Sequence, residues 1–397
     1  MKIKTLALSL AAFTALSLVG CSSAPKTISM DDVTTVTVFN SGTEGVNSFR
    51  IPTIATAVDG SLIVAGEARH ETWKDKSHTD VYLKRSTDGG VTWSESIDIT
   101  GAINDGHAFM DPLLIVEKGS GKIWLFATRW VEFNKDVANN RAFVSVSVDN
   151  GATWSTPSDI TEEIVMPGAF IMGFGPGSGI QIEEGSYASR LIVPTRQAVK
   201  ASAEDNEDTA RSYCVTVYSD DAGDSWKIGE GISPAEECQI AYCGEDNLNL
   251  NIRGRGYRYD AFSADGGLTW SKPTRAEGIP GVENGCQASV MSIGGNGVLF
   301  CGIQGAEPIG DYDNRCKLTL YRSADGAKTW SESQLLYEAA TGYCCMTTLN
   351  DGRLAIVMEA GDQSGFTRIP SRPMGWMRLD VMILPREVTD LNCWFEE

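Results

Sequence analysis

Short motifs with arginine, carboxylate or tyrosine side chains recur along the whole chain, and such side chains can bind an anion and catalyse proton transfer. Arginine holds planar anions through paired, charge-assisted hydrogen bonds. A carboxylate beside a phenol can take its proton, and a second carboxyl can act as general acid. The motifs are Phe49-Arg50-Ile51-Pro52, Arg69 to Asp75, Gly106 to Pro112, Glu236-Glu237-Cys238-Gln239, Leu248 to Arg253, Asn314-Arg315, Thr341-Gly342-Tyr343 and Ile356 to Glu359.

Residue type alone leaves plainer explanations open. Lys74, Asp75 and Lys76 could form a solvated charged loop. An aspartate before a proline, such as Asp111, commonly caps a turn. A tyrosine in a strand, such as Tyr343, is usually a core residue. The elements that position these residues must therefore be considered next.

Metal ions and organic cofactors are not expected. The chain has only three histidines, His70, His78 and His107, and it has no Cys-x-x-Cys pair. Both observations disfavour a zinc site.

The composition is that of a soluble globular protein. With 397 residues, 42% hydrophobic and 21% charged, the chain has the size of one large repeat domain or two ordinary ones. The formal net charge of −19 argues against a nucleic-acid partner, because phosphate binding needs a surplus of Lys and Arg. It does not exclude an anionic small ligand, since a few arginines in a cleft set the local field.

The first twenty residues are predicted to be a signal peptide. A short basic start is followed by an apolar run, Leu6 to Val19, and by Leu18-Val19-Gly20-Cys21. This ending resembles a bacterial lipobox, which implies lipidation at Cys21; the alternative is an ordinary signal peptide with a chance cysteine. We expect residues 1–20 to be removed, 21–32 to be a polar tether and 33–397 to form one domain. Loss of Lys2 and Lys4 gives a mature charge of 31 − 52 = −21. The protein is then exported and anchored in the membrane of the bacterial cell envelope.

The remaining cysteines cannot all pair. Ten minus Cys21 leaves nine, so we expect mostly buried free thiols with one or two disulfides. The side chains of adjacent Cys344 and Cys345 should point to opposite faces of a strand.

An eight-residue repeat is the strongest signal of architecture. The pattern Ser-x-Asp-x-Gly-x-Thr-Trp starts at Ser86, Ser147, Ser219, Ser263 and Ser323, with Ala327 in place of Gly and Ser225 in place of Thr as the two departures. Asp and Gly at these offsets favour a hairpin turn with capped amides and a positive φ, over which the Trp can pack. Alternating β-branched and aromatic residues before the repeats predict strands, for example at 81–84, 141–146, 213–217 and 317–321.

These repeats resemble the Asp-box. The resemblance implies an all-β fold, a β-propeller of four-stranded antiparallel blades with one Asp-box between the third and fourth strands of a blade. Five boxes, with room for one blade that lacks a box, imply six blades. The boxes are then structural, and another motif must carry function.

Phe49-Arg50-Ile51-Pro52, which precedes the first repeat, resembles the FRIP motif of the sialidase (neuraminidase) family. The resemblance extends over nearly all of residues 35–385. It implies that Arg69 contacts the sugar and that Asp75 is the general acid/base, with Asp80 as the alternative. Asp111 resembles the residue that faces the O4 side of the sugar. After Leu191 to Pro194, however, residues 195–197 depart from the family pattern and leave acceptor-side contacts open.

The second half of the chain carries the rest of the resemblance. Glu237 in Glu-Cys-Gln-Ile-Ala matches the family's general base, with adjacent Glu236 as the alternative. Tyr343 matches the nucleophile. The remaining matches are the arginine triad and the acid that supports its first member, and these residues are Arg50, Arg253, Arg315 and Glu359. Arg255 and Arg258 are alternatives to Arg253.

The resemblance implies a retaining exo-α-sialidase that needs no cofactor and removes terminal sialic acids from glycoconjugates. Three guanidiniums would bind the sugar's carboxylate. A neutral phenol can approach the carboxylated anomeric carbon, where an anionic nucleophile would be repelled, and Tyr-nucleophile sialidases depart from the usual pair of carboxylates. The alternatives are a trans-sialidase, inter- or intramolecular, on the same site and a non-catalytic sialic-acid-binding propeller. Linkage preference, N-acyl preference and oligomeric state are not encoded in these motifs.

Overall fold

The computed structural model describes residues 27–131, 137–202, 205–206, 208–309, 312–331, 333–361 and 378–394. Strands dominate this part of the chain, which confirms the all-β prediction. The helices in it are short: α1 (Thr161–Ile164), η1 (Met30–Asp32), η2 (Val137–Asn139), η3 (Arg386–Val388) and η4 (Leu391–Trp394). None of these described helices is long and apolar enough to cross a membrane. Cys21 and the expected signal peptide lie outside the described residues.

Most strands follow one another in antiparallel meanders of four. The first two contain β2 (Ser48–Thr56), β3 (Leu62–Arg69), β4 (Thr79–Ser86) and β5 (Ile97–Asp98), then β6 (Ala108–Val116), β7 (Ile123–Trp130), β8 (Arg141–Ser147) and β9 (Ser158–Asp159). The next two contain β10 (Ala169–Phe174), β13 (Leu191–Val199), β14 (Arg211–Ser219) and β15 (Lys227–Ile228), then β16 (Cys238–Tyr242), β17 (Leu248–Arg253), β18 (Arg258–Ser263) and β19 (Thr274–Arg275).

One long strand, β25 (Gln334–Thr348), joins two further meanders. It pairs first with β24 (Cys316–Ser323) and then, beyond residue 340, with β26 (Leu354–Ala360). On one side lie β20 (Ser289–Ser292) and β21 (Val298–Ile303). On the other, β26 pairs with β27 (Arg378–Leu384), which pairs with the N-terminal strand β1 (Thr34–Asn40). The remaining short strands are β11 (Gly177–Ser178), β12 (Ile180–Gln181), β22 (Ala306–Ile309) and β23 (Tyr312–Asn314).

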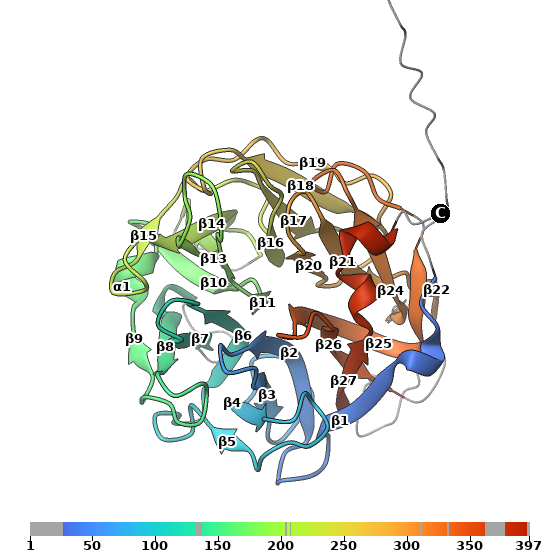
Figure 1. Ribbon diagram of the computed structural model, residues 1–397. Coiled ribbons are helices and arrows are strands. Elements are labelled where there is room, and N and C mark those ends of the chain that lie inside the picture. Colours follow the sequence, from blue (N-terminus) through green and yellow to red (C-terminus); the bar gives the residue numbers. More distant parts are fainter. Residues whose placement is uncertain are drawn as a thin grey trace, which may run out of the picture.

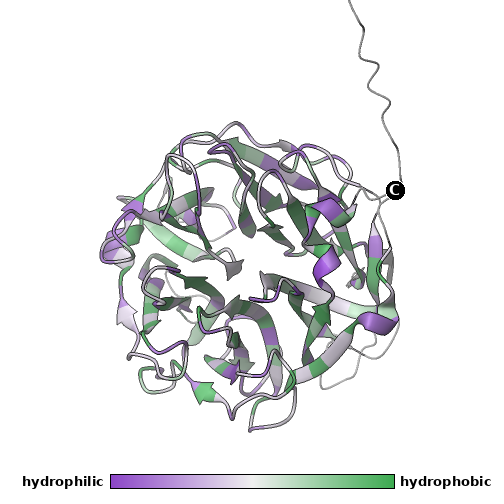
Figure 2. Ribbon diagram, viewed as in Figure 1, coloured by the Kyte–Doolittle hydropathy of each residue, from purple (hydrophilic) through white to green (hydrophobic). Residues whose placement is uncertain are grey.

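The sheets are arranged around a central axis, as in a β-propeller, and β2, β6, β16 and β20 lie near the middle of the view (Figure 1). The hydrophobic colours of Figure 2 follow the strands, while many connecting loops are hydrophilic. Each of the larger buried clusters draws on neighbouring meanders; one, for example, joins Leu113 and Phe126 to Phe174 and Val193. Packing between the faces of adjacent sheets therefore forms the core and holds the inner strands in place.

The five repeats form the turns that the sequence predicts. Each follows the third strand of a meander and leads to the fourth. In the second repeat, Asp149 accepts hydrogen bonds from the amide of Thr153 at 2.8 Å, its hydroxyl at 2.6 Å and the hydroxyl of Ser147 at 2.9 Å. The ring nitrogen of Trp154 donates to the carbonyl of Gly151 at 3.2 Å. The same aspartate contacts recur in the other four repeats, so these aspartates are structural.

Asp149→Ala should therefore destabilise the fold. Loss of these hydrogen bonds is expected to lower Tm by about 1–3 °C at pH 7, measured by differential scanning calorimetry. The hydrogen bonds from Thr153 lower the pKa of Asp149 to about 2. A depressed folded-state pKa stabilises above the unfolded value near 3.8, so the difference from wild type should shrink as the pH falls from 5 towards 2. Asp224→Ala, at an exposed ion pair with Lys122, is the control and should leave Tm unchanged.

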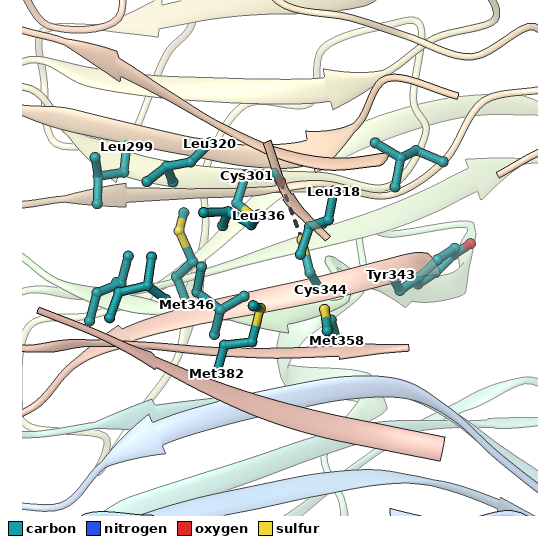
Figure 3. Close-up of a cluster of buried hydrophobic side chains, with 14 of the residues drawn as sticks. Leu299, Cys301, Leu318, Leu320, Leu336, Tyr343, Cys344, Met346, Met358 and Met382 are labelled. Carbon is teal, nitrogen blue, oxygen red and sulfur yellow. Dashed lines mark hydrogen bonds between the residues drawn. The ribbon is translucent and has the colours of Figure 1, made fainter. Parts of the chain in front are cut away.

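The cysteines agree with only part of the prediction. All nine that the structure describes are free thiols, eight of them buried, so the expected one or two disulfides are not formed among them. Cys344 and Cys345 pack into different clusters, which confirms that they face opposite sides of β25. The Cys344 thiol donates to the carbonyl of Cys301, and this contact is drawn in Figure 3.

Candidate active site

Arg50 and Glu359 form a buried ion pair between β2 and β26. Arg50 Nε lies 2.8 Å from Glu359 Oε1, and its Nη2 lies 3.2 Å from Oε2. The carboxylate also accepts the amides of Ile51 and Tyr343, each at 3.1 Å. Glu359 is fully buried, and Arg50 is only 5% exposed. The acid therefore holds in place both the guanidinium and the backbone next to the tyrosine.

Tyr343 on β25 is bonded to an acid that is 106 residues away in the sequence. Its hydroxyl donates a hydrogen bond to Glu237, just before β16. Arg253, the last residue of β17, donates to the same hydroxyl at 3.0 Å and to Glu237 Oε2 at 2.6 Å. In Figure 3 the Tyr343 hydroxyl points away from the other drawn side chains of the buried cluster. The phenol is thus at the edge of the core and faces charged groups.

Three guanidiniums surround this phenol. Arg50 Cζ lies 5.5 Å and Arg315 Cζ 5.9 Å from the centre of the Tyr343 ring, and Arg253 contacts its hydroxyl. Arg253 and Arg315 also donate to the adjacent carbonyls of Asn284 and Gly285, at 3.0 and 2.8 Å.

Gly285 has a φ of 76°, and a Cβ there would lie 2.6 Å from Arg253 Nε. Glycine is therefore required for the close approach of this loop to the arginine.

Protonation states differ sharply between the phenol and the acid. Burial and the charge of Glu237 raise the pKa of Tyr343 well above its usual 10, although Arg253 and Arg315 oppose this. Burial would raise the pKa of Glu237, but Arg253 and Arg196 outweigh it and lower that pKa. At neutral pH the pair is therefore a neutral phenol hydrogen-bonded to a carboxylate, which can accept the phenolic proton.

Asp75 lies in the loop between β3 and β4, and its carboxylate is 2.7 Å from Arg69 Nη1 and 3.9 Å from Arg50 Nη1. Its side chain is 62% exposed. Removal from water would raise the pKa of Asp75, but the two guanidiniums lower it. Arg69 is held in turn by buried Glu67, at 2.6 Å. Asp75 therefore reaches both the arginine cluster and solvent.

The alternative acid, Asp80, is placed differently. It is 4% exposed, and its Oδ1 accepts from the Thr100 hydroxyl at 2.7 Å and Asn104 at 2.8 Å. Its other oxygen lies 2.8 Å from His70 Nε2. These contacts are separate from the arginine cluster, so the geometry favours Asp75 as the carboxyl of the site.

Asp111 on β6 forms a buried ion pair with Arg196 on β13. Burial, with Glu67 and Glu237 nearby, raises the pKa of Asp111 to about 7, although Arg196 opposes this. A Cβ on Gly173 would lie 2.1 Å from Arg196 Nη2 and 2.3 Å from Asp111 Oδ2, so a larger residue would displace the pair. Arg196 lies in the segment where the sequence departs from the family pattern. It stands between the polar residues Thr195 and Gln197 on a largely buried strand, and this run of polar residues is the sequence signal for it.

Three of these residues lie where a strand's pairing register shifts. The shifts fall between Arg50 and Thr53, between Met110 and Leu113, and between Thr341 and Cys344. Ile51 and Asp111 have φ values of 51° and 55°. A β-bulge bends the strand and redirects a side chain, and proline is tolerated there because the ladder is interrupted. The bulges thus explain the prolines that follow Ile51 and Asp111, and they turn Arg50, Asp111 and Tyr343 out of the regular alternation.

The alternatives named for the other motifs are Arg258, Glu236 and Arg255, and they differ in burial. Arg258 is buried, and its Nη1 donates to the carbonyl of Cys286 at 2.8 Å, while burial lowers its pKa to about 10. Glu236 is half-buried, and Arg255 is exposed. Glu237 and Arg253, which contact each other and Tyr343, are therefore the members of these motifs that the structure brings together.

Comparisons with known proteins identify the family of this chain. Residues 54–356 match the family model of the BNR repeat-like domain, and the chain belongs to that family. Its curated relatives include a sialidase of Bacteroides fragilis (strain YCH46), 28% identical over 362 residues and 82% of this chain, and a sialidase of Micromonospora viridifaciens, 27% identical over 81% of the chain. The chain spans 62% and 51% of the length of these two relatives.

Solved structures show the same fold. The Hadza microbial sialidase Hz136 superposes with a TM-score of 0.73 at 23% identity, covering 89% of this chain and 69% of that one. The intramolecular trans-sialidase from Ruminococcus gnavus, in complex with oseltamivir carboxylate, gives 0.69 at 19% identity, covering 91% and 98%. The fold is therefore the β-propeller of the sialidases.

Proposed function

We propose that this protein is an exo-α-sialidase, a glycoside hydrolase that removes terminal sialic acids from glycoconjugates with retention of configuration. The single observation that carries the proposal is the hydrogen bond from the Tyr343 hydroxyl to Glu237, inside a cluster of three arginines. The similarity to curated sialidases supports it. A lectin that only binds sialic acid would not need this activated phenol, the exposed carboxyl of Asp75 or the base.

The arginine cluster accounts for binding of the substrate. Arg50, Arg253 and Arg315 together bind the carboxylate on the anomeric carbon, and Glu359 balances their charge. Arg69 contacts the sugar and holds Asp75, while Asp111 accepts a hydrogen bond on the O4 side. The carboxylate of the substrate also explains the nucleophile, because a neutral phenol approaches it without charge repulsion.

Catalysis then proceeds in two displacements. Tyr343 Oη attacks the anomeric carbon while its proton passes to Glu237, and Asp75 gives a proton to the departing glycosidic oxygen. Water next attacks the tyrosyl-linked sugar; Asp75 takes its proton, and Glu237 returns the proton to the phenolic oxygen. Two inversions at one carbon give overall retention.

Asp75 must be protonated for the first step, although Arg69 and Arg50 lower its pKa in the free protein. The negative charge of a bound substrate carboxylate offsets part of this positive charge. It therefore raises the pKa of Asp75 in the complex. Substrate binding thus favours the protonated form of Asp75 that the first step needs.

Arg196 is a positioning residue for Asp111 in this scheme. Arg196→Met removes the cation that opposes protonation of Asp111, whose pKa is already raised to about 7. The acid is then largely neutral at pH 7, and KM on sialyllactose should rise about tenfold with a smaller change in kcat. Steady-state kinetics between pH 5 and 8 measure this split. Arg211→Met, at an exposed position on β14, is the control and should leave both constants unchanged.

Architecture and location belong to the same proposal. We infer that each four-stranded meander is one blade, that the repeats are Asp-boxes, and that six blades make up the propeller in a single domain, residues 33–397. The leader supports cleavage before Cys21, lipidation of its thiol and attachment to the bacterial cell envelope.

Cys21→Ser should release the protein from the membrane fraction and prevent labelling with a fatty-acid analogue.

Product analysis tests the proposed reaction directly. Proton NMR during incubation with α2,3- and α2,6-sialyllactose should show free sialic acid, formed first as the α-anomer. First appearance of the β-anomer would contradict the double displacement. An anhydro sugar or a new sialoside as main product would replace hydrolysis by intra- or intermolecular transfer. Binding of sialyllactose without turnover would identify a lectin.

A further inference from the structure

His70, His78 and Asp80 lie together outside the candidate active site, although the composition disfavours a metal centre. His70 follows β3 and His78 precedes β4, and the amide of His70 donates to the carbonyl of His78 at 3.1 Å. The hairpin register pairs Arg69 with Thr79 and Ala68 with Asp80. His78 and Asp80 are two residues apart, so their side chains lie on one face of the strand. Cross-strand pairing brings His70 to that face as well.

The three side chains converge on one point. Nε2 of His70 lies 2.8 Å and Nε2 of His78 3.7 Å from Oδ2 of Asp80. One ligand atom from each residue lies within 4.8 Å of the other two, and the imidazole rings are 4.5 Å apart. A tetrahedral zinc ion with bonds of about 2.0–2.2 Å places its ligand atoms about 3.3 Å apart. Small side-chain movements therefore suffice to reach that spacing.

The surrounding hydrogen bonds leave the ligand atoms directed at this point. Oδ1 of Asp80 is occupied by Thr100 and Asn104, which leaves Oδ2 towards the histidines. Nδ1 of His78 lies 3.0 Å from Glu71 Oε1, which leaves Nε2 towards Asp80. A carboxylate on the far nitrogen of a histidine is the usual arrangement behind a metal ligand, because it fixes the ring and raises its basicity.

Charge and exposure also suit a cation. Asp80 is a buried carboxyl, while the side chains of His70 and His78 are 21% and 33% exposed. Solvent can thus reach the point between them and supply a fourth ligand. Two imidazoles and one carboxylate favour a borderline transition metal such as Zn²⁺ over Mg²⁺ or Ca²⁺, which prefer oxygen.

We propose that His70 Nε2, His78 Nε2 and Asp80 Oδ2 bind one divalent transition-metal ion of the zinc type, with water as fourth ligand. The ion joins the two ends of the loop that carries Asp75, since one ligand precedes that residue and two follow it. Its role is to restrain this loop. Binding does not depend on sialidase activity, so the metal site can be tested separately from the proposed function.

The test is a titration of the purified full chain with Zn²⁺ by isothermal calorimetry, and with Co²⁺ by visible absorption. We expect one equivalent to bind with Kd of about micromolar or below, with the bands of four-coordinate Co²⁺. His78→Gln, at the more exposed histidine, should weaken binding by more than tenfold, and Glu71→Gln by about 10–100-fold. Saturating Zn²⁺ should raise Tm by several degrees in the wild type but not in His78→Gln.

His107→Gln is the matched control. His107 also contacts an aspartate, Asp105, but lies outside the cluster, so this variant should bind zinc like the wild type. Absence of one-equivalent binding in the wild type would overturn the proposal. Zinc binding by both His70→Gln and His78→Gln with the affinity of the wild type would also overturn it. Thiolate charge-transfer bands with Co²⁺ would assign the metal to cysteines instead.

Discussion

Replacing Tyr343 by phenylalanine is expected to lower kcat on α2,3-sialyllactose by at least about three orders of magnitude, because it removes the oxygen of the proposed nucleophile. The ring stays, so its packing in the buried cluster drawn in Figure 3 is kept. Loss of the hydroxyl leaves Glu237 and Arg253 paired with each other at 2.6 Å, which limits the cost in stability. Kinetics and a Tm within a few degrees of wild type together check this.

A mechanism-based label gives the second measurement. A fluorinated sialosyl fluoride should modify the peptide that contains Tyr343 in the wild type, as seen by mass spectrometry. Tyr321→Phe, at a buried tyrosine on neighbouring β24, is the control and should retain activity and labelling. Label on another residue, or substantial turnover by the phenylalanine variant, would contradict the nucleophile assignment.

Asp75→Ala should lose about 10²–10⁴-fold in kcat on sialyllactose and much less on an aryl sialoside in the first step. A sugar alkoxide leaves poorly without a proton, whereas an activated phenolate leaves nearly unaided. The second step still lacks its base, so the aryl substrate should give a burst followed by slow turnover. Stopped-flow detection of the phenolate measures both phases. Added azide or formate should speed the slow one.

Asp80→Asn is the matched control for Asp75. It keeps the shape of the side chain, and its contacts with Thr100 and Asn104 lie outside the arginine cluster. It removes a carboxylate ligand of the proposed metal site, so both variants are compared in buffer without added metal. It should show no dependence on the leaving group. The reverse behaviour of the two variants would make Asp80 the general acid/base. Absence of the leaving-group effect in both would place the acid elsewhere.

Local sequence signals account for most of the fold. The repeats carry their own turn chemistry in contacts two to four residues apart, and the strands before them alternate clearly. Strand pairing between distant segments left no such local signal. β1 pairs with β27 although Thr34 and Ile383 are 349 residues apart in the sequence. β25 pairs with β24 in one meander and with β26 in the next, and no motif marks the residue where it passes between them.

The site was predictable residue by residue only through motifs. The motifs predicted Tyr343, Glu237 and the three arginines as site residues. They did not predict the hydrogen bond between Tyr343 and Glu237, because that bond depends on the packing of separate meanders. No motif singled out Glu67, the buried acid that pairs with Arg69 from two residues earlier on the same strand. Arg196 looked like a departure from a pattern, yet its partner is Asp111. The proximity of His70 and His78 could be recognised only once the pairing register of β3 and β4 was known.

The pairing of β1 with β27 has a consequence for biosynthesis. Thr34 lies opposite Ile383, so the sheet that begins near the start of the chain is completed only by a strand near its end. During translation β1 must remain without its native neighbour until almost all of the polypeptide has left the ribosome. Its late docking adds a contact of very high sequence separation, which slows folding. A nascent chain that stops before residue 378 lacks β27, which leaves β1 and β26 as exposed edges open to aggregation.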